Sequence, residues 1–123
     1  MPGNKEFGER IRQLREAKKK ADPKFSLRQF AAAVDVSATY LSKVETGQFA
    51  PPAAETIKKM AKLLGTDADE LLALAKKTDP ELGNIIREQP KAMADFLRTA
   101  REKGLTAEDI QKITEKIRQG KKP

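Results

Sequence analysis

The chain has 123 residues with a formal net charge of +7, so it is one or two small domains, and its charge favours a polyanionic partner. It has no Cys, which excludes disulfides and thiolate metal sites, and no His, the commonest general base and metal ligand; we therefore expect no metal site, no cofactor and no enzyme activity. No apolar run approaches the roughly 18 residues needed to span a membrane, and the charged N-terminus does not read as a signal peptide, so we expect a cytoplasmic protein.

The first predicted element is an amphipathic helix from about Lys5 to Lys19. Phe7, Ile11 and Leu14 recur at helical spacing, which places them on one face. The basic run Lys18 to Lys20 leads into a segment, residues 21–24, that is expected to be a loop. It either touches a polyanion or is simply solvated, and we favour the second interpretation.

A pair of short helices is predicted between Ser26 and Gly47. Ser26 has the hydroxyl that caps a helix start, and Ser37 repeats the signal further on. Asp35 stands between the two helices and tolerates the left-handed backbone conformation that such turns often need. Gly47 is a typical residue just after a helix end. The second helix of the pair should therefore cover about residues 38–46.

This second helix is expected to turn a polar face outward. Successive residues of a helix are rotated by about 100°, so Leu41 and Val44 are expected to point to the core. The side chains that point away are small hydroxyls and one long cation, which suits the reading of base edges in a DNA major groove. A merely solvated helix face is the alternative. The outward positions are Thr39, Ser42, Lys43 and Thr46.

This helix pair resembles the Cro/C1-type (XRE family) helix-turn-helix of phage and bacterial repressors. The matching features are the close helix contact, the turn and the closing run, namely Ala31, Val36-Ser37 and Leu41-Ser42-Lys43-Val44-Glu45-Thr46-Gly47. The resemblance extends over about residues 7–75. It implies an all-α fold with a five-helix, lambda-repressor-like DNA-binding domain at residues 1–77 and double-stranded DNA as the partner.

The resemblance also implies which positions contact DNA bases. Ala38 and Thr39 carry small side chains at positions where the family often has longer amide side chains. This weakens the reading of bases by hydrogen bonds and favours a methyl contact with thymine. Lys43 is the residue expected to read guanine. The implied base-contacting positions are Ala38, Thr39, Ser42 and Lys43.

Phosphate contacts are implied at the starts of the second and third helices and just after the third. Leu27 departs from the family, in which a glutamine at this position usually holds a phosphate, so we expect Arg28 or Lys24 to take over. The positions expected to bind phosphate are Lys24, Leu27, Arg28, Ser37, Tyr40 and Gln48.

Arg15 matches the family's arginine that pairs with a glutamate at the end of the recognition helix, here Glu45. Such a pair would lock the first helix to the third, although a buried ion pair is weak evidence for net stability. The alternative is that both residues are ordinary surface charges.

The chain beyond Gly47 is expected to resume helix after two prolines. Because proline is tolerated in the first turn of a helix but not inside it, a fourth helix should run from about Pro52 to Leu64. Asp67 should cap a fifth helix. The segment 77–80 contains a proline that breaks the pattern, and it is the predicted domain boundary.

Residues 78–119 are predicted to be a helical C-terminal region, followed by a basic tail at 120–123. Thr106 and Asp109 form a capping-box signal. Apolar residues cannot bury themselves in a lone short helix, so these helices must dimerise, pack on the first domain or on one another, or bind another protein. The face expected to form a homodimer contains Phe96, Leu97, Ile110, Ile113 and Ile117.

The function favoured by these observations is a sequence-specific transcriptional repressor, bacterial or phage and associated with the nucleoid, that acts as a homodimer on a palindromic operator. One alternative is an antitoxin whose C-terminal helices bind a toxin. Another is a repressor whose C-terminal helices are cleaved by a zinc metallopeptidase. Sequence-independent binding through charge is a further alternative.

Overall fold

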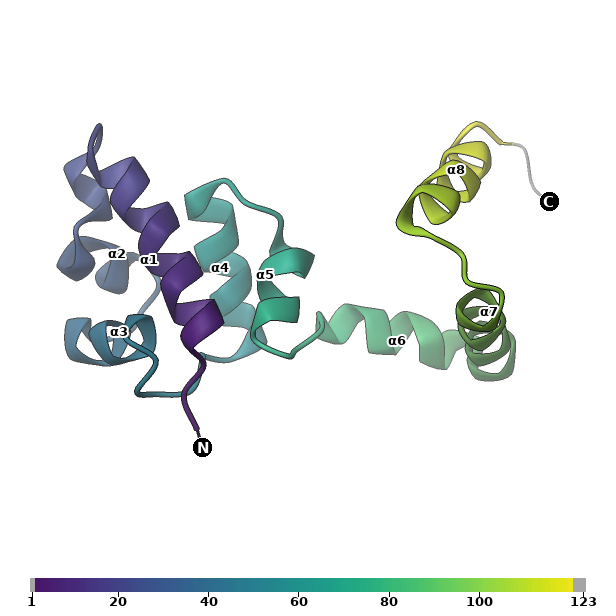
Figure 1. Ribbon diagram of the computed structural model, residues 1–123, viewed down its shortest axis with the longest axis horizontal. Helices are drawn as coiled ribbons and strands as arrows, with labels where there is room; N and C mark the ends of the chain where they lie inside the picture. Colours follow the sequence, from purple (N-terminus) through teal and green to yellow (C-terminus); the bar gives the residue numbers. More distant parts are fainter. Residues whose placement is uncertain (1, 121–123) are drawn as a thin grey trace. The chain divides into compact units, whose positions relative to one another are not determined.

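The computed structural model describes residues 2–120, which form α-helices and one 3-10 helix and contain no β-strand (Figure 1). The all-α class predicted from the sequence is therefore confirmed. The chain divides into two units between Pro80 and Glu81. The predicted basic tail at 120–123 lies outside the described residues, except for Gly120. None of the described helices is long and apolar enough to cross a membrane.

The first unit is built from five α-helices and the 3-10 helix. The 3-10 helix occupies part of the segment expected to be a loop, because Pro23 favours a first turn and the Asp22 carboxylate accepts a hydrogen bond from the Lys24 amide at 2.9 Å. The elements are α1 (Lys5–Lys19), η1 (Pro23–Phe25), α2 (Leu27–Ala33), α3 (Ala38–Glu45), α4 (Ala54–Leu64) and α5 (Ala68–Leu74).

Helix α4 begins two residues later than predicted. Ala53, which precedes it, has an extended backbone with ψ at 156°, so the helix cannot start at Pro52. Its end agrees with the prediction, because Gly65 adopts the left-handed conformation with φ at 69°.

The predicted helix starts are confirmed by side-chain caps. Ser26 accepts from the Gln29 amide at 3.3 Å, and Ser37 accepts from the Tyr40 amide at 3.0 Å. Asp67 caps α5 in the same way at 2.9 Å. Each cap joins a residue to the third residue after it, so it depends on local sequence alone.

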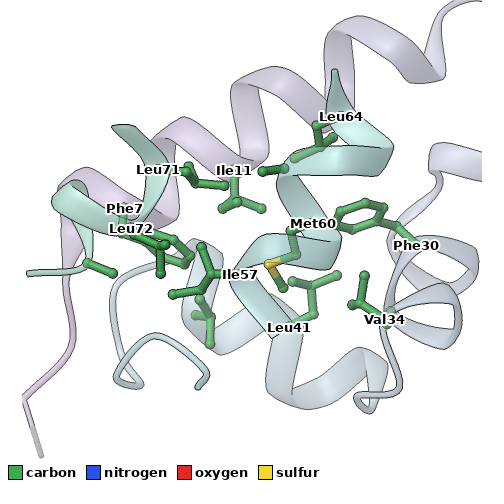
Figure 2. Packing of buried hydrophobic residues seen from close by; sticks show 14 residues of the cluster. Phe7, Ile11, Phe30, Val34, Leu41, Ile57, Met60, Leu64, Leu71 and Leu72 are labelled. Atoms are coloured by element: carbon green, nitrogen blue, oxygen red, sulfur yellow. The ribbon is translucent and has the colours of Figure 1, made fainter. Parts of the chain in front are cut away.

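Apolar side chains from α1 to α5 meet in one continuous core (Figure 2). Helix α3 contributes Leu41 and Val44, both of which are buried as predicted. Full burial of a side chain of this kind is worth about 1.5–3 kcal/mol, so the core fixes which face of α3 is turned inward. The other large buried side chains are Phe7, Ile11, Phe30, Val34, Ile57, Met60, Leu64, Leu71 and Leu72.

The second unit consists of α6 (Pro80–Glu88), α7 (Pro90–Glu102) and α8 (Ala107–Arg118). The predicted capping box starts α8: Thr106 accepts from the Asp109 amide at 3.1 Å, and the Asp109 carboxylate accepts from the Thr106 amide at 3.0 Å. No residue between 81 and 120 is buried. The exposed large apolar side chains of these helices are Leu82, Ile85, Phe96, Leu97, Ile110 and Ile117.

Candidate nucleic-acid interface

The turn between α2 and α3 sets the direction of α3. Asp35 adopts the left-handed conformation with φ at 60°, as predicted. The Val36 amide then donates to the Ala31 carbonyl at 3.0 Å, which closes the turn. Because Leu41 anchors α3 in the core one turn later, the start of α3 is held from both sides.

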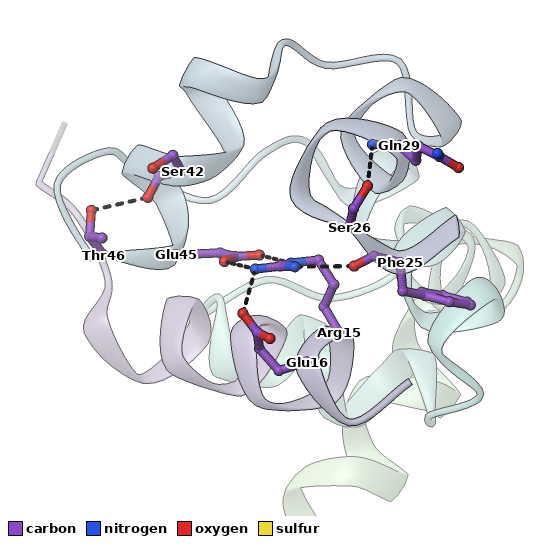
Figure 3. A network of polar contacts seen from close by, with 8 residues as sticks. All are labelled: Arg15, Glu16, Phe25, Ser26, Gln29, Ser42, Glu45 and Thr46. Carbon is purple, nitrogen blue, oxygen red and sulfur yellow. Dashed lines mark hydrogen bonds and ion pairs between the residues drawn. The ribbon is translucent and has the colours of Figure 1, made fainter. Parts of the chain in front are cut away.

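An ion pair inside the first unit holds the end of α3. The Arg15 guanidinium meets the Glu45 carboxylate with two hydrogen bonds, Nε to Oε2 at 2.7 Å and Nη2 to Oε1 at 2.9 Å (Figure 3). Both side chains are nearly inaccessible, at 5% and 4% exposure. The Arg15 Nη1 also donates to the Phe25 carbonyl at 3.1 Å. One guanidinium thus joins α1, η1 and α3.

The hydrogen bonds to Glu45 raise the pKa of Arg15, and burial opposes this rise. The guanidinium of Arg15 therefore keeps its positive charge. Its two parallel bonds define an orientation as well as an attraction, because the planar guanidinium fits a carboxylate in only a few ways.

Gly8 permits the close approach of α1 to the end of α3. A Cβ atom at this position would collide with the Val44 carbonyl oxygen and lie 2.8 Å from the Glu45 carbonyl oxygen. Gly8 was not among the residues predicted to matter from the sequence. A glycine inside a strong helical pattern was the available signal, since such a residue often has a packing reason.

The positions implied for base contact are not equally accessible. Thr39 is exposed, whereas Ser42 and Lys43 are half-buried. Ala38 is half-buried because its methyl group packs against the core. The polar groups that remain available on this face are the hydroxyls of Thr39 and Ser42 and the ammonium of Lys43.

Lys43 lies over an aromatic ring. Its Nζ is 5.3 Å from the centroid of Phe49, and the Phe49 ring is in turn 6.1 Å from the ring of Tyr40. The Tyr40 hydroxyl donates to the Ala50 carbonyl at 3.1 Å, and partial burial raises the pKa of Tyr40. Phe49 was not among the predicted site residues.

The positions implied for phosphate contact also differ. Lys24 and Arg28 are exposed cations. Leu27 offers no polar side-chain group and packs against the core, and the Tyr40 hydroxyl hydrogen is already donated to a carbonyl. Ser37 is exposed, and its hydroxyl oxygen is engaged as the helix cap. Gln48 is exposed, and its side-chain amide donates to the Thr46 hydroxyl at 3.1 Å, which leaves a second N–H. Gln48, Lys24, Arg28 and the exposed hydroxyl of Ser37 therefore remain suited to an anionic ligand.

The described residues contain no group of three or more acidic side chains that could hold a metal ion. What the surface of α3 presents instead is a set of neutral hydroxyl groups and one ammonium, with cations at Lys24 and Arg28 on the preceding segment. Such groups donate hydrogen bonds to anionic or carbonyl acceptors.

Comparison with known proteins matches residues 6–74 to the family model of the helix-turn-helix domain. The chain belongs to this family. Its capped α2–α3 pair lies inside the matched segment, as do Arg15 and Glu45.

The chain is also 35% identical over 69 residues to a protein of Bacillus subtilis (strain 168) named uncharacterized HTH-type transcriptional regulator RghRB. The match covers 56% of this chain and 46% of that protein, so it spans about half the length of the relative. No solved structure gives a significant match.

Proposed function

We propose that this protein is a DNA-binding transcriptional regulator and that α3 is its recognition helix. The observation that carries the proposal is the anchoring of α3 within a helix-turn-helix domain: Leu41 and the Arg15–Glu45 pair fix its inner side, and Thr39, Ser42 and Lys43 lie on its outer side. The name of the Bacillus subtilis relative supports the same role. A binding function of this kind requires no catalytic group.

In detail, we propose a Cro/C1-type repressor that places α3 in the major groove. Lys43 donates to the acceptors of guanine, and Thr39 and Ser42 contact neighbouring bases, with Ala38 close to a thymine methyl group. Lys24, Arg28, Ser37 and Gln48 bind phosphates on either side, and these contacts set the position of the helix without reading sequence. The protein, of bacterial or phage origin, then acts in the cytoplasm, where it is associated with the nucleoid.

One helix of this length reads only a few base pairs, so useful specificity requires two copies on a palindromic site. We propose that the second unit provides the contact between the copies. The supporting observation is the exposure of large apolar side chains on α7 and α8, namely Phe96, Leu97, Ile110 and Ile117. Ile113, between the two isoleucines on α8, is half-buried.

In a second candidate function, the same apolar side chains bind a different protein. An antitoxin would use them to bind a toxin, and a peptidase-controlled repressor would present them to the peptidase. Exposed apolar patches commonly mark protein contacts, and this is the observation that favours either alternative.

Selection of binding sites from random duplex DNA tests the main proposal. We expect an enriched inverted repeat, and Lys43→Ala should then relax the preference at one position in each half-site, at a cost of about 1–3 kcal/mol. Lys116→Ala in α8 is the matched control, since it removes the same charge outside α3. Equal weakening of all sequences by both variants would show binding through charge alone and contradict the proposal.

Sedimentation of the full chain at micromolar concentration tests the homodimer. We expect a dimer that Ile110→Lys together with Ile117→Lys converts to a monomer, while Gln111→Lys, an exposed position on α8, leaves it unchanged. A monomeric mass for the unaltered protein would contradict the dimer and favour a different protein partner.

A further inference from the structure

The aromatic ring of Phe49 is exposed but has contacts with Tyr40 and Lys43. Phe49 is 44% exposed. The ring lies just outside α3, beside the lysine to which we assign base reading. The function proposed above makes no use of it.

The backbone ties Phe49 to Lys43. Gly47 adopts the left-handed conformation with φ at 79°, which reverses the chain after α3. The amides of Gln48 and Phe49 then both donate to the Lys43 carbonyl, at 2.8 and 3.1 Å. The turn therefore returns Phe49 to the level of Lys43.

The side chains of Phe49 and Lys43 are also in contact. Tyr40 lies one turn before Lys43 on α3, and its ring is 6.1 Å from that of Phe49 and tilted by 44°, so it limits the movement of Phe49. The Lys43 ammonium is 5.3 Å from the centroid of the Phe49 ring, within the range of a cation–π interaction. The Tyr40 hydroxyl is itself held by the Ala50 carbonyl at 3.1 Å.

A free lysine side chain populates many rotamers, and binding to a single base acceptor must restrict them. A contact that already restricts them in the absence of DNA lowers this entropic cost. It also narrows the set of base pairs that the ammonium can reach, which increases the preference of Lys43 for one base pair over the others.

We propose that Phe49 is a positioning residue for Lys43. Its ring holds the ammonium at the outer side of α3 before DNA binds, and it thereby sets how sharply Lys43 discriminates its base pair. This inference rests on the proposed function, because it concerns base reading by the same helix. It assigns Phe49 no direct contact with DNA.

The contact itself is tested in the full chain without DNA. In a nuclear magnetic resonance spectrum the Lys43 ε-methylene protons should be shifted upfield by the ring current of Phe49. Phe49→Leu should abolish this shift while keeping apolar contact with Tyr40, and Phe49→Tyr should retain it. Identical lysine shifts in the unaltered protein and in Phe49→Leu would overturn the inference.

The effect on reading is tested on the selected DNA site. Phe49→Leu should reduce the preference for the best base pair at the Lys43 position by about 2- to 5-fold, as expected for loss of an exposed cation–π contact, and Phe49→Tyr should restore it. In the Lys43→Ala background, Phe49→Leu should cause no further loss. Thermal unfolding of each variant checks that the fold is intact.

The remaining outcomes separate the inference from the function. If a site is enriched but Phe49→Leu leaves the preference unchanged, or acts equally without Lys43 and at another base pair, the positioning role is wrong and the main proposal stands. If no site is enriched, the proposed function fails, and the reading role of Phe49 fails with it even where the lysine shift persists.

Discussion

Residues 2–80 and residues 81–120 both consist of amphipathic helices, but they use their apolar side chains differently. In the first unit Ile57 is completely buried in a core to which five helices contribute. In the second unit Ile117, the same residue type at a similar place in a helical pattern, is 51% exposed. No residue from 81 to 120 is buried.

The two units show that a sequence can form a helix without burying its apolar face. Helix α8 has a complete capping box, and α7 starts with a proline at its first position, so both have clear local start signals. Isolated helices of 12 or 13 residues are nonetheless marginal in water without packing. The helices of the second unit therefore lack the buried core that stabilises the helices of the first unit.

The largest expected effect comes from breaking the buried ion pair of the first unit. Arg15→Ala should lower the free energy of unfolding by about 3–5 kcal/mol, because it leaves the Glu45 carboxylate buried and unpaired. Urea unfolding followed by circular dichroism measures the loss. Lys112→Ala is the control in the second unit, where the pair with Glu108 is exposed and should contribute less than about 1 kcal/mol. Similar effects of the two variants would contradict the contrast between the units.

A matched pair of isoleucine truncations tests the same contrast for apolar residues. Ile57→Ala should destabilise the first unit by about 2–5 kcal/mol through the cavity that it creates. Ile117→Ala should leave the unfolding of the first unit unchanged within about 0.5 kcal/mol. Urea titrations at two protein concentrations measure both. An equally large and concentration-independent loss for Ile117→Ala would show that α8 is buried against its own chain.

Two helical glycines give a smaller contrast. Gly8→Ala should destabilise the protein by about 1–3 kcal/mol, because the new methyl group forces α1 away from the end of α3. Gly83→Ala in α6 meets only the flexible end of Arg87 at 3.3 Å, so the better helix propensity of alanine should make it neutral or stabilising by up to about 1 kcal/mol. Thermal unfolding compares them, and a neutral Gly8→Ala would contradict the close approach.

The smallest effect concerns the pH dependence of Tyr40. Burial raises the pKa of Tyr40 above its ordinary value of 10.0, so the folded state favours the neutral phenol. This contribution to stability is fully present below pH 10 and is lost as the pH rises through the raised pKa. Tyr40 is the sole tyrosine, so ultraviolet absorbance of tyrosinate follows it alone. A midpoint equal to that of the urea-unfolded chain would contradict the burial.

Most helix boundaries could be predicted because they depend on neighbours in the chain. Ser37, Asp67 and Thr106 each accept a hydrogen bond from the amide three residues ahead. The left-handed conformation of Asp35 could be predicted because this residue stands between the end of α2 and the cap of α3. The 3-10 helix Pro23–Phe25 was missed, since a short proline-containing segment between helices reads equally well as a loop. The pairing of Arg15 with Glu45 was expected from a family resemblance, because spacing alone does not identify a partner 30 residues away.

The sequence by itself determined the all-α class, the capped α2–α3 pair and the inward side of α3, because caps and helical periodicity act over only a few residues. Only the tertiary structure decided that Gly8 lets α1 touch the backbone of α3 and that Phe49 lies beneath Lys43. The first contact depends on how closely two helices approach, which packing of the core decides. The second depends on the turn at Gly47, which returns Phe49 to the level of Lys43, and on where the two side chains then lie. The surface of α3 that we propose to read DNA is therefore set by residues outside α3 as well as by those on it.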